Sequence, residues 1–263
     1  MDAAFFDLDK TVIAKASMVA FHKPLRRAGI VSRSLVLRAL WAQLVYLHLG
    51  ADEERMAQMR ESVLRLTKGW DQAKVSEVVR ETLEEVIEPI VYDEAVDLIR
   101  AHQAAGRRVF IVSASPVEVV APLARFLGVD DAIATRARLD ADGRYTGEVE
   151  FDSHGIHKVF AMLELAERHD LDLGRSWAYS DSITDVPMLE AVGHPVAVNP
   201  DKDLAKEAAE RGWEVLHFGR EVPLRDRVPM PSRTQTAAGA VGVTASVAAG
   251  VAGWWWWYRR ERT

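Results

Sequence analysis

The sequence predicts an α/β protein in which helices cover both faces of a mostly parallel β-sheet. Short apolar segments typical of strands alternate with amphipathic helical segments along most of the chain. One long stretch, from about residue 15 to residue 92, has apolar positions at helical spacing only. Because this stretch follows the first strand directly, it predicts a helical subdomain inserted into the sheet-forming part.

The individual elements follow from local signals. The first strand is expected at residues 3–8, and later apolar strands are expected at 109–112, 132–135, 177–179, 195–198 and 213–216. Helices are expected at about 93–104, 116–127, 157–169, 185–191 and 202–211. Residues 136–151 favour a hairpin, because Asp142 and Gly143 form a typical turn pair. Strands joined by helices are expected to run parallel.

The composition limits the class of protein. The chain has 263 residues, a formal net charge of −6 and no cysteine. This length allows one large domain or a domain with a smaller module. Without cysteine there is no disulfide scaffold, thiolate metal site or cysteine nucleophile. The acidic balance disfavours nucleic acid as a partner. Asp2, Asp7 and Asp9 interrupt any apolar leader, so we expect no signal peptide and a cytoplasmic catalytic part.

Asp7 and Asp9 come at the end of the first strand, in the segment Phe5-Phe-Asp-Leu-Asp-Lys-Thr11. Since side chains alternate along a strand, we expect the two carboxylates to point the same way. In open α/β sheets, ligands bind at the carboxyl ends of the strands. Two carboxylates there repel each other unless a cation or a shared proton offsets their charge. The alternative is an acidic turn that binds nothing.

Ser113 and Ser115 follow the strand at 109–112 and precede a helix. A hydroxyl group near the N–H groups of a helix N-terminus can bind an anion, which favours Ser113 as a ligand. Ser115 is expected to cap the helix. Lys158 comes at the start of a later helix, where its charge opposes the helix dipole. A bound anion or a carboxylate partner is therefore expected there, and a solvated lysine is the alternative.

Asp181 and Asp185 lie four residues apart, on the turn after the strand at 177–179. Either carboxylate could reach a metal ion at the edge of the sheet. The alternative is an ordinary cap in the first turn of the next helix.

The order of these four segments is more informative than any one of them. Carboxylates follow one strand, serines follow the next, and a lysine and two more aspartates come later in the chain. In this order the segments resemble the motifs of the haloacid dehalogenase (HAD) superfamily of phosphatases. More narrowly, the chain resembles subfamily IB, the phosphoserine-phosphatase-like group, over residues 3–217. The resemblance implies a Rossmann-like doubly wound parallel sheet, formed by residues 1–14 and 91–218. It also implies an inserted all-helical cap of residues 15–90.

The resemblance implies a phosphomonoester hydrolase with a role for each residue. Asp7 would be the nucleophile that forms an aspartyl-phosphate, and Asp9 would be the general acid and then the general base. Mg²⁺ would be held by Asp7, the backbone carbonyl of Asp9 and Asp181. Asp185 would orient the metal's ligands or Lys158. The phosphoryl oxygens would be bound by three side chains, Thr11, Ser113 and Lys158.

Two departures from the family pattern bear on the substrate. Phosphoserine phosphatases of this group typically have Ser-Gly-Gly in the second motif and an asparagine before the last aspartate, whereas this chain has Ser113-Ala-Ser115 and Thr184. These departures disfavour phosphoserine itself, so the expected substrate is a small or lipid phosphomonoester selected by the cap. A phosphomutase or phosphotransferase of the same fold, or a membrane-tethered scaffold protein, remains an alternative. Asp9 disfavours a dehalogenase, which lacks a carboxylate at that position.

The C-terminal residues differ in kind from the rest of the chain. Residues 219–233 are rich in Pro and Arg and favour a linker. Residues 234–258 carry no charged side chain and end in four consecutive tryptophans and a tyrosine. Such a segment is long enough to span a bilayer, and its aromatic end with flanking arginines resembles an interfacial belt. Residues 234–263 are therefore predicted to form a hydrophobic tail helix that attaches the protein to the cell membrane; a disordered tail is the alternative.

Overall fold

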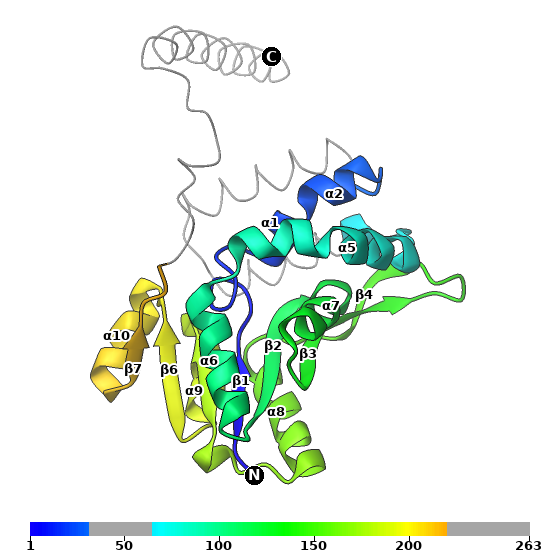
Figure 1. Cartoon of the computed structure of the whole chain (residues 1–263). Helices are drawn as coiled ribbons and strands as arrows, with labels where there is room; N and C mark the ends of the chain where they lie inside the picture. The colour runs from blue at the N-terminus through cyan, green and yellow to red at the C-terminus, as the bar shows by residue number, and fades with distance from the viewer. Residues whose placement is uncertain (32–64, 220–263) are drawn as a thin grey trace, which may run out of the picture. The chain divides into compact units, whose positions relative to one another are not determined.

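The computed structural model describes residues 1–31 and 65–219. Their centre is a seven-stranded sheet with the order β4-β3-β2-β1-β5-β6-β7 (Figure 1). Every neighbouring pair is parallel except β3 and β4, which are antiparallel. The strands are β1 (Ala3–Phe6), β2 (Arg108–Pro116), β3 (Asp131–Leu139), β4 (Tyr145–Phe151), β5 (Trp177–Ser180), β6 (His194–Val198) and β7 (Glu214–Leu216).

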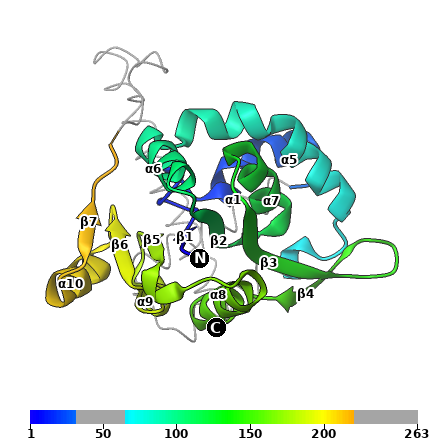
Figure 2. The same ribbon diagram turned by 60° about the horizontal axis from the view of Figure 1, so that its bottom comes forward.

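Helices cover both faces of this sheet, as Figure 2 shows. One face carries α6 (Asp93–Ala104) and α7 (Val117–Leu127), with α5 (Gln72–Ile87) packed against α7. The other face carries α8 (Ile156–His169), α9 (Val186–Glu190) and α10 (Lys202–Arg211). Three short 3₁₀ helices join them, η1 (Glu88–Ile90), η2 (Leu173–Arg175) and η3 (Ile183–Asp185). The predicted doubly wound α/β sheet is therefore confirmed.

The central strand β1 divides the hydrophobic core into two layers. Its side chains alternate, so Ala4 and Phe6 pack in the layer under α5, α6 and α7, while Ala3 and Phe5 pack in the layer under α8, α9 and α10. All four side chains are fully buried. An apolar strand buried on both faces is typical of parallel sheets. Because this burial fixes the register of β1, it also fixes the position of the loop that begins at Asp7.

The predicted hairpin is present as β3 and β4. Gly143 lies in its turn with a φ of 73°, a left-handed conformation that glycine adopts without strain. The hairpin reaches the helical segment before α5: the Gly69 amide donates to the Tyr145 carbonyl at 2.8 Å, and the Tyr145 amide donates to the Trp70 carbonyl at 3.0 Å. The backbone of residues 69–70 is thereby tied to the start of β4.

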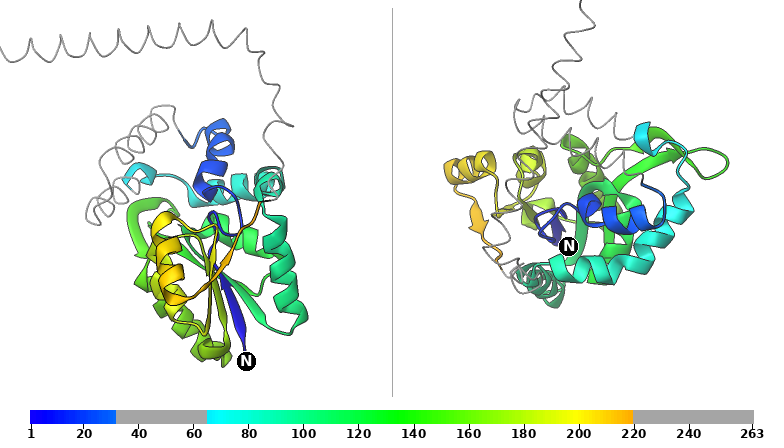
Figure 3. Two further views of the ribbon diagram at one scale, coloured as in Figure 1. Left: turned by 90° about the vertical axis from the view of Figure 1, so that its left-hand side faces the viewer. Right: turned by 90° about the horizontal axis from the view of Figure 1, so that it is seen from above.

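The helical residues between β1 and α6 include α1 (Ser17–Ala20), α2 (His22–Arg27) and α5, which lie over the carboxyl ends of the central strands (Figure 3). The chain leaves the sheet and returns to it at one place. The Ala14 amide donates to the Ile90 carbonyl at 2.7 Å, and the Tyr92 amide donates to the Val12 carbonyl at 3.0 Å. The helical segment therefore has two adjacent connections to the sheet-forming part.

Two sequence predictions concern residues outside the described part. The apolar helical positions from Leu35 to Leu47 lie in residues 32–64, and most of the predicted linker and the whole tail lie in residues 220–263. Across residues 1–31 and 65–219, no helix combines the length and the apolar character that crossing a membrane requires.

Candidate active site

The first motif lies in a loop rather than on a strand. β1 ends at Phe6, the Asp7 amide donates to the Tyr179 carbonyl at 2.9 Å, and Lys10 has a φ of 64°. The sequence analysis placed Asp7 and Asp9 at the end of a strand, which is wrong because β1 ends before them. The argument from strand alternation therefore does not apply to these two residues. The two carboxylates have different partners, which a turn beyond the strand makes possible.

Asp7 belongs to a buried cluster with Lys158 and Asp185. The Lys158 ammonium donates to Asp7 Oδ1 and to Asp185 Oδ2, both at 2.7 Å. All three residues are at most 6% exposed. The Ser180 hydroxyl also donates to Asp185 Oδ2 at 2.7 Å. The predicted alternative of a solvated lysine is therefore wrong, and the predicted carboxylate partner of Lys158 is present twice.

Local backbone geometry places these three side chains together. Asp7 follows β1, Asp185 ends η3 after β5, and β5 pairs with β1 in parallel. Lys158 lies in the first turn of α8, which begins after Gly155 with a φ of 54°. The carboxyl ends of two neighbouring strands and one helix start thus converge, as expected for a ligand site in an open α/β sheet.

Asp181 lies at the same edge, directly after β5, and is 7% exposed. The Lys10 ammonium lies 3.8 Å from Asp181 Oδ2, but the Lys10 side chain is 66% exposed. Such an exposed partner offsets little of the charge of a buried carboxylate. The structure therefore brings the first and fourth predicted motifs together.

The pKa values of the carboxyl groups at this edge reflect mainly their burial. Burial raises the pKa of Asp7 to about 8; Lys158 opposes this shift, and Asp185 adds to it. Burial also raises the pKa of Asp181 to about 6, against the attraction of Lys10. Burial alone would lower the pKa of Lys158, but Asp7 and Asp185 raise it above its ordinary value. The lysine is therefore charged, and its attraction offsets only part of the effect of burial on the pKa of Asp7.

This donor set fits a hard divalent cation. The carboxylate oxygens of Asp7 and Asp181 are the ligands that Mg²⁺ prefers, and a cation beside them would lower their raised pKa values. Within the described ranges, no three acidic or histidine side chains cluster closely enough to hold a metal by themselves. The metal site that the family resemblance implies needs only two carboxylates and the Asp9 carbonyl. The residues present are therefore compatible with such a site.

Ser113 and Ser115 lie in β2, next to β1 and at the same edge of the sheet. The Ser113 hydroxyl oxygen accepts the Ser115 amide at 3.1 Å and is buried. Ser115 does not cap the helix: β2 continues to Pro116, which is the N-cap residue of α7 and makes no side-chain cap bond. The Ser115 hydroxyl instead donates to Asp9 Oδ2 at 2.7 Å. The predicted cap is therefore wrong.

Thr11 is fully buried in the loop after β1. Within the part of the chain that the structure describes, its hydroxyl has no hydrogen-bond partner. A buried hydroxyl without a partner is unfavourable, which leaves it available to a ligand oxygen. A phosphate-binding role for Thr11 stays a prediction.

Sequence reasoning missed two hydroxyl groups, Ser17 and Ser180. Ser180 is the last residue of β5, and its hydroxyl donates to Asp185. Its position directly before Asp181 could have indicated that it belongs to the site. Ser17, at the start of α1, contacts both Asp9 and Ser115. No local pattern indicated it, because its hydroxyl bonds Ser115, which is 98 residues away in the sequence.

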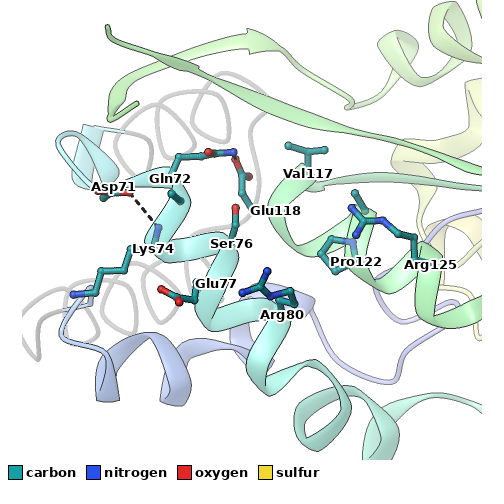
Figure 4. A pocket seen from close by; sticks show the side chains of 12 residues that line it. Asp71, Gln72, Lys74, Ser76, Glu77, Arg80, Val117, Glu118, Pro122 and Arg125 are labelled. Atoms are coloured by element: carbon teal, nitrogen blue, oxygen red, sulfur yellow. Dashed lines mark hydrogen bonds between the residues drawn. The ribbon is translucent and has the colours of Figure 1, made fainter. Parts of the chain in front are cut away.

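An open cavity of about 870 Å³ lies between α5 and α7 (Figure 4). Its walls carry charged side chains of both signs, including Lys74, Glu77 and Arg80 from α5 and Glu118 and Arg125 from α7. None of the predicted site residues lines it. The cavity is therefore separate from the buried carboxylate cluster.

Comparison with known proteins agrees with this geometry. Residues 4–190 match the model of the haloacid dehalogenase-like hydrolase family. A protein of Mycobacterium tuberculosis named "probable phosphatase" is 51% identical over 250 residues, which cover 95% of this chain and 87% of that protein. A phosphoserine phosphatase of the same organism is 36% identical over 253 residues, covering 95% and 77%.

Among solved structures, a protein of unknown function from Bordetella pertussis Tohama I is 34% identical, with a TM-score of 0.71. The match covers 82% of this chain and 97% of that one. The chain thus belongs to the haloacid dehalogenase-like hydrolase family. These matches confirm the prediction that the chain is a phosphatase-type enzyme of the phosphoserine-phosphatase-like group.

Proposed function

We propose that this hydrolase is a Mg²⁺-dependent phosphomonoesterase that works through an aspartyl-phosphate on Asp7. The observation that carries the proposal is the buried Lys158, which holds Asp7 Oδ1 and Asp185 Oδ2 at 2.7 Å each. A lysine held this way fixes a carboxylate and also supplies positive charge for a phosphoryl group. Phosphoryl transfer needs mainly such positioning and charge neutralisation.

The proposed reaction has two steps. In the first, a carboxylate oxygen of Asp7 attacks phosphorus, the bond from phosphorus to the ester oxygen breaks, and Asp9 gives a proton to that leaving oxygen. In the second, Asp9 takes a proton from water while the water oxygen attacks phosphorus and the bond to Asp7 breaks. Phosphate leaves, and both aspartates return to their starting states.

We propose that Asp7, Asp181 and the Asp9 carbonyl would hold Mg²⁺. The ion would neutralise the charge that develops on the phosphoryl oxygens. Support comes from the raised pKa values of Asp7 and Asp181: burial disfavours their ionised forms, and the nearby lysines offset this effect only in part. Ser113, Thr11 and Lys158 are proposed to bind the phosphoryl oxygens.

The substrate is proposed to be a small or lipid phosphomonoester. One relative is named a phosphoserine phosphatase, so phosphoserine belongs in any substrate panel. The departures at Ser113-Ala-Ser115 and Thr184 argue against it as the preferred substrate. A panel of phosphomonoesters that includes phosphoserine and lysophosphatidic acid distinguishes these possibilities.

We also propose that residues 234–258 attach the enzyme to a membrane. The uncharged segment, its four consecutive tryptophans and the arginines on both sides support this proposal. Attachment would favour a substrate that is itself in the membrane.

The proposal is tested with the full chain and p-nitrophenyl phosphate. The wild type should release phosphate with Mg²⁺ and stop when EDTA is added. Asp7→Asn should abolish release, because its amide is not a nucleophile, while far-UV circular dichroism stays unchanged. Asp130→Asn is the matched control: Asp130 is partly exposed and holds Arg108 and the Val109 amide at the opposite end of the strands. Equal activity in the wild type and Asp7→Asn would overturn the proposal.

A further inference from the structure

Asp9 is held by two serines that come from different parts of the chain. Asp9 Oδ1 accepts the Ser17 amide at 2.7 Å, and Asp9 Oδ2 accepts the Ser115 hydroxyl at 2.7 Å. The Ser17 hydroxyl donates to the Ser115 hydroxyl at 2.8 Å. Ser17 is fully buried and Ser115 is 7% exposed. Both carboxylate oxygens thus have short donors, and the donors also hold each other.

These contacts fix a side chain that is otherwise free to turn. The terminal torsion of an aspartate is broad, so the plane of its carboxylate is set by its hydrogen bonds. Hydrogen bonds to an ionised carboxylate are about twice as strong as neutral ones. Donors on both oxygens, at the distances seen here, leave the carboxylate a single orientation.

The local structure of β2 aims Ser115 at Asp9. The pairing of β2 with β3 changes register between Ser113 and Pro116, an irregularity of the kind that redirects side chains beside active sites. Through this irregularity the Ser115 amide donates to Ser113 Oγ at 3.1 Å, while the Ser115 hydroxyl reaches Asp9. The proposed phosphate ligand Ser113 and the proposed acid Asp9 are thereby connected through one residue.

We propose that Ser115 and Ser17 are positioning residues that orient the Asp9 carboxylate for proton transfer to and from the reacting oxygen. The inference rests on the proposed function and adds two residues to it. Ser115 comes from the sheet and Ser17 from the first helix of the inserted segment, so the acid is oriented only while α1 stays against the sheet. Orientation matters because small displacements of a catalytic group lower rates by orders of magnitude.

The leaving group provides the test. Phenolate, whose conjugate acid has a pKa of about 10, needs a proton as it leaves. The more acidic p-nitrophenol leaves readily without one. The quantity kcat/KM covers the steps up to formation of the phosphoenzyme, so comparing phenyl phosphate with p-nitrophenyl phosphate isolates the acid role of Asp9.

Ser115→Ala should lower kcat/KM for phenyl phosphate by about 10- to 100-fold, which is less than the roughly 100- to 10,000-fold that general acid catalysis contributes, because Asp9 itself remains. For p-nitrophenyl phosphate, kcat/KM should change less than about 3-fold, while kcat and KM fall together because Asp9 also serves as base in the second step. A burst of p-nitrophenol then precedes the steady state. Ser17→Ala keeps the amide that bonds Asp9 and removes only the hydroxyl that holds Ser115. It should therefore lower kcat/KM for phenyl phosphate more than for p-nitrophenyl phosphate, as Ser115→Ala does but by a smaller factor, and Ser17→Thr, which keeps the hydroxyl, should retain the wild-type ratio.

The matched control is Ser176→Ala. Ser176 is also fully buried, and its hydroxyl bonds backbone groups of Ala3 and Asp172, away from the carboxyl edge of the sheet. Ser176→Ala should lower the melting temperature without changing the ratio of kcat/KM for p-nitrophenyl phosphate to kcat/KM for phenyl phosphate. Asp9→Asn should show the largest ratio, and adding Ser115→Ala to it should change that ratio no further.

The outcomes separate this inference from the proposed function. If wild type and Asp7→Asn hydrolyse p-nitrophenyl phosphate equally, the proposed function itself fails. If the wild type depends on Asp7 and Asp9, but Ser115→Ala and Ser17→Ala change kcat/KM for both substrates by the same factor, only the positioning role is overturned. A Ser115→Ala chain that does not fold leaves the decision to Ser17→Ala, whose ratio then supports or overturns the inference.

Discussion

Replacing Lys158 by methionine tests whether the buried cluster is held together by charge. The substitution keeps a long, unbranched side chain but removes the ammonium group. In the wild type that group donates to Asp7 and Asp185 at 2.7 Å each, and Lys158 is 3% exposed. Removing one partner of a buried ion pair typically costs about 3–5 kcal/mol, because the remaining charge has no counterion.

The loss should depend on pH, because the remaining carboxyls can take up protons. The folded-state pKa of Asp7, about 8, lies above the ordinary aspartate value of 3.8. A carboxyl with a raised pKa contributes stability below its unfolded pKa and loses it as pH rises through the folded pKa. Without Lys158 the pKa of Asp7 rises further, so the variant loses more stability between pH 6 and pH 9 than the wild type. We expect about 3–5 kcal/mol at pH 9 and about 1–2 kcal/mol at pH 6.

The measurement is urea unfolding of the full chain, followed by circular dichroism in EDTA at pH 6 and pH 9. Lys206→Met is the matched control, because the Lys206 side chain is 77% exposed and pairs with Glu210 on the surface of α10. It should lower the free energy of unfolding by less than about 0.5 kcal/mol at either pH. A Lys158→Met loss that is equal at both pH values, or below about 1 kcal/mol at pH 9, would show that the charge argument is wrong.

Three further predictions concern other parts of the chain. Tyr145→Phe removes the hydroxyl that bonds the buried Glu118 between the hairpin and α7, and urea unfolding should show a loss of about 1–2 kcal/mol; no loss would contradict that contact. Mg²⁺ should raise the melting temperature more at pH 8 than at pH 5.5, because its carboxyl ligands must be ionised; equal shifts would argue against Asp7 and Asp181 as ligands. A chain ending after Arg233 should move from the membrane fraction to the soluble fraction, and unchanged partitioning would refute attachment through the tail.

The sheet could be predicted from the sequence because each strand has a strong local signal. Residues 3–6 and 109–112 are continuous apolar runs, and both lie in central strands buried on both faces. Their carboxyl ends meet at one edge, so polar residues directly after each run were expected to lie close together. The buried contacts among Asp7, Lys158 and Asp185 follow from that topology.

The surroundings of Asp9 could not be predicted in the same way. The strand at 109–112 continues through Ser113 and Ser115, although these residues lack the apolar pattern that marks a strand. Ser115 therefore does not occupy the cap position that its place before a helix suggested. Its bond to Ser17 joins residues 98 apart, and such a contact depends on how the inserted segment packs against the sheet. Local patterns carry no information about that packing.

The carboxylates at this edge lower the stability of the metal-free protein, and Asp181 allows this to be measured. Burial disfavours the ionised form of Asp181 and raises its pKa to about 6, above the ordinary aspartate value of 3.8. Asp181→Asn should therefore raise the free energy of unfolding in EDTA at pH 8 by about 1–2 kcal/mol. The gain should shrink at pH 5, where the wild-type carboxyl is mostly protonated. The same variant should lose most of the stabilisation by Mg²⁺, because it lacks a proposed ligand. Asp130→Asn, at the opposite end of the strands, should show neither effect. If Asp181→Asn lowers the metal-free stability at pH 8, the carboxylate is held by contacts that favour its charge, and the argument for a cation at this edge fails.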